Sequence, residues 1–121
     1  MSTTRQIPRQ EWTRYFDELT RRFFKDGNPE AATVEVISPD LGDQVAADFV
    51  RALGVAYDPR NEVLEVLLDG VDHLVYHPRE VWVVEEDNGF VSTLEIVRDD
   101  DTREVVRFRS VGIVPRPDAA G

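Results

Sequence analysis

Three short turn signals, each between two apolar runs, constrain the fold of this chain more than any other feature. Asp58 and Pro59 begin the first, Asn88 and Gly89 form the second, and residues 99–101, all aspartate, form the third. Asp and Pro favour the first positions of a type I turn, and Asn-Gly tolerates the positive φ angles of a tight hairpin turn. Strands joined by short turns pair antiparallel, because a parallel return needs a long crossover. The second half of the chain is therefore predicted to be an antiparallel meander.

The N-terminal segment has a different periodicity. Its large apolar residues recur at helical spacing and form one broad stripe: Trp12, Tyr15, Phe16, Leu19 and Phe23. Pro8 suits the first turn of a helix, and Gly27 with Pro29 supplies a stop. We therefore expect an amphipathic helix whose apolar stripe packs on the sheet.

Two segments connect this helix to the meander. Thr33–Ile37 is β-branched and alternating, and Pro39 follows it, so a strand is predicted. Residues 42–54 are predicted to form a short helix, because their apolar side chains fit a helical stripe: Val45, Ala46, Phe49, Val50 and Leu53. The expected fold is α+β, with an N-terminal amphipathic helix packed on a curled antiparallel sheet of about six strands, either open or closed into a small, partly open barrel.

Chain length limits the number of domains. A chain of 121 residues falls within the usual size of one compact domain. We expect a single α+β domain over residues 1–114 and a flexible tail over residues 115–121, which shows no apolar periodicity.

Charge and composition argue against several classes of function. Fourteen basic and 24 acidic side chains give a net charge of −10, which repels phosphate backbones and anionic membrane surfaces. Nucleic acid is therefore not the expected partner, although Arg103, Arg107 and Arg109 form a local basic strip. The absence of cysteine excludes disulfides, thiolate catalysis and cysteine metal sites.

The sequence also lacks membrane and export signals. No apolar run approaches the roughly 18 residues of a membrane span. The N-terminal residues have no apolar segment of the kind found in a secretory signal. We expect a soluble protein in the cytoplasm.

Both histidines lie in the stretch from Gly70 to Val84. Gly70 before them and Pro78 after them leave no room for a helix. On a strand, a rise of about 3.3 Å per residue separates His73 from His77 by ~13 Å, so the two cannot share a metal by local geometry. His73 is expected to be a half-buried strand residue bonded to a backbone group. His77 is expected to structure the turn before Pro78, which restricts the His77 backbone to extended conformations. No metal or cofactor is expected.

Two functions fit these residues. The first is a non-enzymatic protein-binding or adaptor module, or a homo-oligomer, because the edges of a small antiparallel sheet carry unpaired backbone groups. Its candidate contact surface is the polar cluster of Asp72, His73, His77 and Arg79.

The alternative is a small hydrolase or metal-assisted enzyme. It would use His73 and His77 with Asp58 and Asp69, aspartates from the neighbouring hairpin. The nearest candidate nucleophiles lie in no recognisable motif and are Ser38, Ser92 and Thr93. No catalytic residue is therefore assigned.

Five segments carry a family resemblance, in the order EWTRYFDELTR, TVEVISPDLGDQV, LGVAYDPRNEVLEVLL, DHLVYHPREVWV and LEIVRDDDTREVVRFR. Over nearly the whole chain the sequence resembles the family catalogued as domain of unknown function 5335. The most specific pieces are YDP and the pattern of His73, Pro78 and Val81. The resemblance implies a small, stand-alone microbial protein without assigned catalytic residues. One departure is RDDDTRE, where a glycine is expected after the aspartates.

Overall fold

A computed structural model describes residues 1–25 and 29–111 of the chain. Eight strands form one antiparallel sheet in the order β1-β6-β7-β8-β2-β3-β4-β5, so β1 and β5 are its two ends. The strands are β1 Thr3–Ile7, β2 Glu30–Ser38, β3 Gly42–Asp58, β4 Val63–Leu68, β5 Val71–Tyr76, β6 Pro78–Glu85, β7 Val91–Arg98 and β8 Arg103–Ser110. A sheet with a helix is confirmed, but the sheet has eight strands instead of about six. The predicted tail, residues 115–121, lies outside the described residues.

The N-terminal helix is short. A 3-10 turn at Arg9–Glu11 leads into α1, Trp12–Leu19, which continues as one π-helical turn, η2, over Thr20–Phe24. The predicted stripe is confirmed: Trp12, Phe16 and Leu19 are buried, and Tyr15 and Phe23 pack half-buried against the core. Within the described residues, no helix has the length and apolar character needed to cross a membrane.

The helix predicted for residues 42–54 was wrong, because this segment is the first part of β3. It follows a tight turn after Ser38 and pairs with β2 from Gly42 onwards. The turn brings the chain back beside β2. The backbone N–H and C=O groups of this segment, which a helix would pair internally, bond the backbone of β2 instead. Val45 and Phe49, members of the expected buried stripe, are exposed. Tertiary pairing therefore overrode the local periodicity.

β1 was also missed by the sequence analysis. Four of its five residues are exposed and only Ile7 is buried. The segment becomes a strand because it pairs with β6, from Thr3 opposite Glu85 to Ile7 opposite Val81. These partners are far away in the sequence, so local pattern gave no signal.

The three predicted hairpins are confirmed, with corrections at two turns. The first turn is held by Asp58, whose Oδ1 accepts the Arg60 backbone N–H at 3.0 Å. The second is a longer loop, residues 86–90, in which Gly89 has a φ of 91° while Asn88 has no positive φ. In the third, Asp101 has a φ of 69°. Asp101 therefore takes the left-handed position expected of glycine, which Asp tolerates better than most residues.

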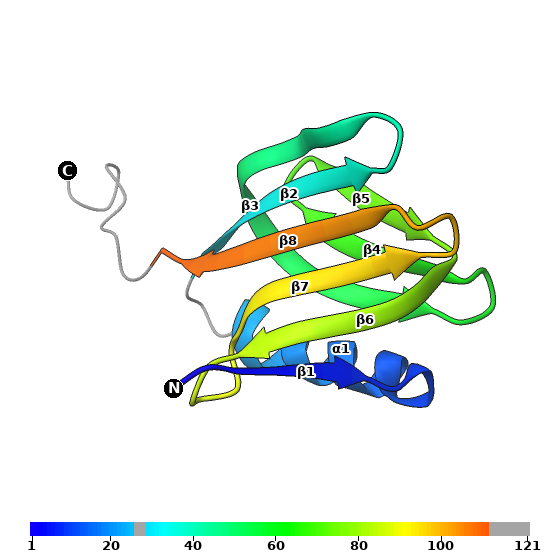
Figure 1. Ribbon diagram of the computed structural model, residues 1–121. Helices are drawn as coiled ribbons and strands as arrows, with labels where there is room; N and C mark the ends of the chain where they lie inside the picture. Colours follow the sequence, from blue (N-terminus) through cyan, green and yellow to red (C-terminus); the bar gives the residue numbers. More distant parts are fainter. Residues whose placement is uncertain (26–28, 112–121) are drawn as a thin grey trace.

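The curled sheet forms two layers (Figure 1). One contains β1, β6, β7, β8, β2 and the first part of β3, and the other contains the second part of β3 with β4 and β5. Buried apolar side chains from both layers fill the space between them. The layers are continuous through β3, which changes partner from β2 to β4 around Ala52.

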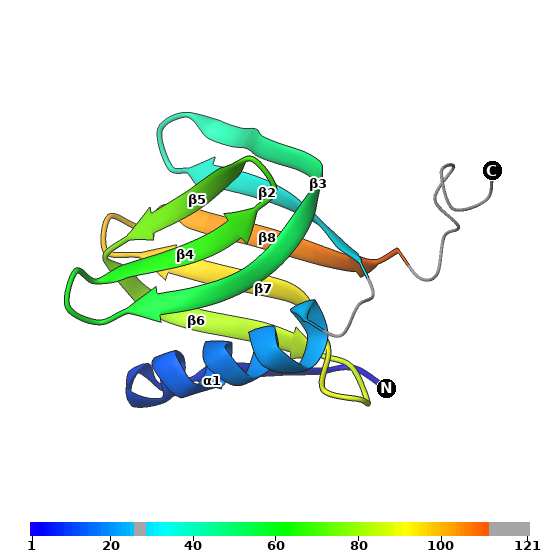
Figure 2. The same cartoon turned by 180° about the vertical axis from the view of Figure 1, so that it is seen from behind.

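The two long sides of this arrangement differ. On the first, called the helix side, α1 contacts β3 and runs along the lower border of the sheet next to β1 and β6 (Figure 2). The Trp12 ring packs edge to face on Tyr57 at 5.0 Å between centroids, and its Nε1 donates to the Ile7 carbonyl at 2.8 Å. On the second, called the open side, lie β5 and the first part of β3, residues 42–50; both views place them away from α1.

Candidate functional site

The four residues of the predicted contact surface do not form one cluster. Asp72 and His73 point to opposite faces of β5, since side chains alternate along a strand. Asp72 is exposed and His73 is half-buried. His77 lies at the corner between β5 and β6, and Arg79 follows on β6, where its Nη2 pairs with Asp101 Oδ1 at 3.0 Å. The structure thus divides the set between the β5 strand and the corner.

The corner residue His77 has a φ of 55°, so the extended conformation predicted for it was wrong. Its N–H donates to the Glu62 carbonyl at 2.8 Å, and its carbonyl accepts the Asp99 N–H at 3.1 Å. These two bonds join the β3–β4 and β7–β8 turns to the corner. They satisfy both backbone groups of His77, which outweighs the usual preference of a residue before proline.

His73 contacts a carboxylate and not the expected backbone group. Its Nε2 bonds Oε1 of Glu104, a β8 residue that is only 2% exposed. The other Glu104 oxygen lies 3.4 Å from Nη1 of Arg98 on β7. The cluster of His73, Glu104 and Arg98 therefore joins β5 to the opposite layer. Pairing on both oxygens is what allows a buried carboxylate.

Neither Glu104 nor Arg98 was among the predicted site residues. A signal for Glu104 does exist, because alternation places it on the same face as the buried residues Val106 and Phe108. Its partner His73 lies 31 positions away, and only the tertiary structure brings the two together.

The residues of the enzymatic alternative have other bonds. Asp58 accepts hydrogen bonds within its own turn, and the Asp69 N–H donates to the Arg51 carbonyl. The Ser92 hydroxyl donates to Glu86 at 2.7 Å, and Ser38 Oγ accepts the Asp40 N–H at 3.2 Å. Among residues 1–25 and 29–111, no group of three His, Asp or Glu side chains has the arrangement of a metal site.

The open side has two strand edges without a described partner. β5 is the last strand of the sheet and pairs with β4 on one side. Residues 42–50 of β3 pair with β2 on one side, and pairing with β4 begins only at Ala52. On their other sides, neither edge pairs with any strand in the described part of the chain. Such edges accept a further strand.

Exposed apolar side chains are concentrated on the same side. Apart from Met1, the large apolar residues exposed in the described chain all lie in β5, in β3 or in the turn before β3: Leu41, Val45, Phe49, Leu53, Val71, Leu74 and Tyr76. Single exposed apolar residues are ordinary, but a group along open strand edges indicates an interaction surface.

Acidic residues surround this surface. Residues 40–53 and 63–76 contain a single basic residue, Arg51, and six carboxylates: Asp40, Asp43, Asp48, Glu65, Asp69 and Asp72. The open side therefore combines apolar side chains with negative charge, which suits a partner with apolar and basic side chains.

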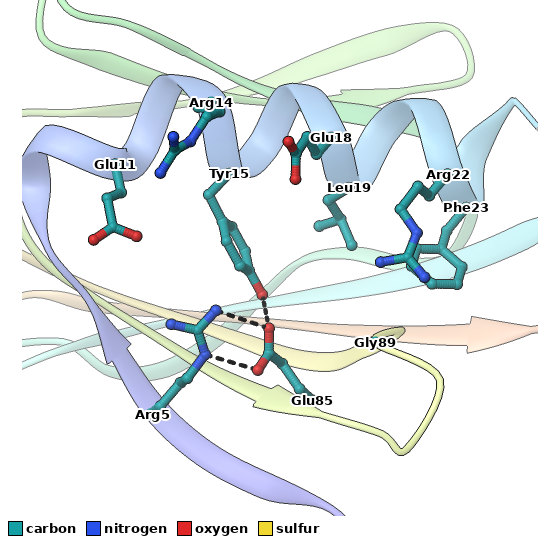
Figure 3. A pocket seen from close by; sticks show the side chains of 10 residues that line it. All are labelled: Arg5, Glu11, Arg14, Tyr15, Glu18, Leu19, Arg22, Phe23, Glu85 and Gly89. Carbon is teal, nitrogen blue, oxygen red and sulfur yellow. Dashed lines mark hydrogen bonds and ion pairs between the residues drawn. The ribbon is translucent and has the colours of Figure 1, made fainter.

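A separate groove of about 280 Å³ lies between α1 and the strands β1 and β6 (Figure 3). At its floor Glu85 accepts hydrogen bonds from Arg5 Nε at 2.7 Å and from the Tyr15 hydroxyl at 2.6 Å. The bond from Arg5 holds the pKa of Glu85 below its ordinary value, and burial together with the bond to Glu85 raises the pKa of Tyr15. Because these groups already bond one another, the groove joins α1 to the sheet.

Comparison with known proteins gives matches over nearly the whole chain. Residues 3–117 match the profile of a family described as Family of unknown function (DUF5335). The chain is also 37% identical, over 118 residues, to an uncharacterized protein of Aquifex aeolicus (strain VF5); the match covers 95% of this chain and 98% of that protein. No solved structure matches the chain significantly. The matched range includes both sides of the sheet.

Proposed function

The chain belongs to the family of unknown function DUF5335, and from that premise we propose that it is a non-enzymatic, cytoplasmic protein-binding module. Its partner is another protein, which contributes an extended segment as an added strand on β5. The observation that carries this proposal is the coincidence of an unpaired strand edge with exposed apolar side chains on the open side.

Backbone bonding supplies the general part of the interaction. β5 has six residues, and those whose N–H and C=O groups point away from β4 offer bonds to a new strand. Addition of a strand to a sheet edge is a common mode of peptide recognition, in which backbone bonds contribute affinity and side chains contribute selectivity.

Side chains on the outer face of β5 supply the selectivity. Asp72, Leu74 and Tyr76 share this face, and all three are exposed. A matching segment places a basic residue against Asp72 and apolar residues against Leu74 and Tyr76. A second copy of this chain fits less well, because each copy carries a net charge of −10.

The other predicted contact residues position the strand. His73 joins β5 to β8 through Glu104, and His77 with Arg79 holds the corner where β5 ends. A β5 strand held at its middle and at its end loses little conformational freedom on binding, which favours affinity.

The proposal is tested by selecting random peptides from a displayed library on the immobilised protein. We expect selected peptides to alternate apolar residues and to include a basic residue. Leu74→Arg puts a positive charge on the edge and is expected to weaken their binding at least about tenfold. Thr4→Arg, an exposed residue of β1 at the opposite end of the sheet, is the matched control and leaves binding unchanged.

Two results would contradict the proposal. Equal binding of the peptides to the wild type and to Leu74→Arg would place their site elsewhere. Sedimentation could also show that the wild type is a dimer and that Leu74→Arg dissociates it. The partner on β5 would then be a second copy of the chain and not another protein.

A further inference from the structure

The outer face of β2 and β8 contains a hollow of about 270 Å³ that is separate from the β5 edge. Thr33 and Glu35 line it from β2, Arg107 and Arg109 from β8, and Phe49 from the bend of β3. On β2 and β8 these residues lie next to buried core residues such as Val34 and Phe108, so their side chains face away from the space between the layers.

Phe49 is strained without being buried. Its φ is 53°, a left-handed conformation that is rare for a bulky residue. Its N–H donates to Thr33 Oγ1 at 3.3 Å, yet 58% of the residue is exposed. Burial of the ring therefore does not compensate the strain. Strain of this kind is concentrated at ligand sites.

Arg109 lies next to this ring, and no residue in the described part of the chain accepts a hydrogen bond from its guanidinium. Its guanidinium carbon lies 6.0 Å from the centroid of the Phe49 ring. On the same strand, Arg103 pairs with Glu95 at 3.3 Å and Arg107 pairs with Glu35, so most of the basic strip seen in the sequence is neutralised. Arg109 pairs with no carboxylate in the described part of the chain.

The charge of the hollow is opposite to that of the whole chain. Its lining contains two arginines, Arg107 and Arg109, and one carboxylate, Glu35, so its net charge is +1. The chain as a whole carries −10. A small anion can therefore bind here, while an extended polyanion such as RNA is repelled by the surrounding surface.

We propose that this hollow binds a small organic anion with a flat ring, whose carboxylate or phosphate bonds the Arg109 guanidinium. The ring packs on the exposed face of Phe49, as aromatic groups do in offset or edge-to-face pairs. The Thr33 hydroxyl accepts from Phe49 and keeps its own hydrogen for the anion. The hollow of about 270 Å³ is slightly smaller than typical small-molecule sites, which start at about 300 Å³, and so fits only a compact ligand. This site is independent of the proposed function.

The test is a set of titrations followed by the backbone amide NMR signals of Thr33, Phe49 and Arg109. The probes are 2-naphthoate, 2-naphthyl phosphate, inorganic phosphate and the neutral 2-naphthamide. We expect both ring-bearing anions to bind, with inorganic phosphate and 2-naphthamide binding more weakly. The tighter of the two ring-bearing anions identifies the acidic group, and either order supports the proposal.

Variants separate the anion contact from the ring contact. Arg109→Gln is expected to weaken binding of the preferred probe about tenfold, because a charge-assisted hydrogen bond is lost. Arg103→Gln makes the same charge change on the same strand outside the hollow and leaves binding within about twofold. Phe49→Gly removes the ring and also relieves the strained φ, so it is expected to weaken binding about fivefold without loss of folding stability.

Three results would overturn the proposal. In the first, no probe shifts these amide signals at millimolar concentration. In the second, 2-naphthamide binds as tightly as 2-naphthoate, or Arg103→Gln and Arg109→Gln have equal effects. In the third, a single-stranded oligonucleotide binds more tightly than either ring-bearing anion and with a steeper salt dependence, which would assign the face to nucleic acid.

Discussion

The helix side and the open side of the sheet face the same structural problem with different outcomes. At each side the strands of the two layers are not paired with one another in the described chain. On the helix side α1 carries Trp12 and Phe16, 1% and 0% exposed, and the Trp12 ring packs on Tyr57 of β3. On the open side the strand edges of β5 and of the first part of β3 pair with no described strand, and Phe49 is 58% exposed.

The difference shows which part of the molecule holds the fold and which part is available for partners. A helix satisfies its own backbone and can therefore cover a gap with side chains alone. A strand at a sheet edge leaves half of its backbone groups unpaired, and these groups can still form hydrogen bonds to another strand. We infer that apolar residues stabilise the fold on the helix side and serve recognition on the open side.

The largest change in stability is expected when one phenylalanine is replaced on each side. Phe16→Ala empties part of the core and is expected to lower the free energy of unfolding by about 3–5 kcal/mol. Phe49→Ala removes an exposed ring and is expected to change it by less than about 1 kcal/mol. Urea denaturation measures both. Similar losses for the two variants would show that the open side also supports the fold.

The next effect concerns Glu104 of β8, a buried carboxylate that bonds His73 of β5 on the open side. Glu104→Ala leaves His73 and Arg98 without their shared partner and is expected to cost about 2 kcal/mol of unfolding free energy, less than a fully buried pair because both partners are partly exposed. Glu35→Ala, which breaks a more exposed pair with Arg107, is the control and costs less than about 1 kcal/mol. Equal losses of unfolding free energy in the two variants would show that Glu104 stabilises the fold no more than an exposed ion pair does.

A third, smaller effect tests the contact between η2 and β3. A methyl group added at Gly54 would lie 2.7 Å from Thr20 Cγ2, so Gly54→Ala is expected to cost about 1–2 kcal/mol. Thr20→Ser removes Cγ2 and keeps the hydroxyl, which bonds the N–H and the carbonyl of Val55. In the double variant, part of the lost stability should return in the urea midpoint. Additive losses would mean that the clash is not the cause.

The smallest effect is a pH dependence on the helix side. The pKa of Glu85 is lowered from 4.5 by Arg5 first and Tyr15 second. A lowered folded-state pKa adds stability that is present above the unfolded value and is lost as the pH falls through the folded value. Acidification below about 4.5 should therefore destabilise the wild type relative to Glu85→Gln, by less than about 1 kcal/mol. Parallel melting-temperature profiles against pH would contradict this.

Residues near one another in the sequence were the ones predicted well. The stripe of Trp12, Phe16 and Leu19 packs as expected, and the turn at Asp58 forms the expected hairpin. The helix expected around Val45 was wrong because pairing with β2 overrode a periodicity that also fits a helix. β1 gave no signal, since the strand with which it pairs, β6, lies far away in the sequence.

In the candidate site, too, contacts between residues far apart in the sequence were not predicted. Asp72, a member of the predicted contact surface, is exposed on β5, whereas the bond from His73 to Glu104 was not foreseen. The apolar members of the open side were not predicted to be exposed: Leu74 was not singled out, and Phe49 was assigned to a helical stripe. Exposure depends on which strands remain unpaired.

By itself the sequence determined the N-terminal helix, the turns of the meander and the excess of negative charge, because each depends on residue types within a few positions or on composition alone. Only the tertiary structure decided that α1 covers one side, that β5 ends the sheet, and that Glu104 is buried beside His73. Those features depend on contacts between residues far apart in the chain, and local chemistry does not select among the possible pairings.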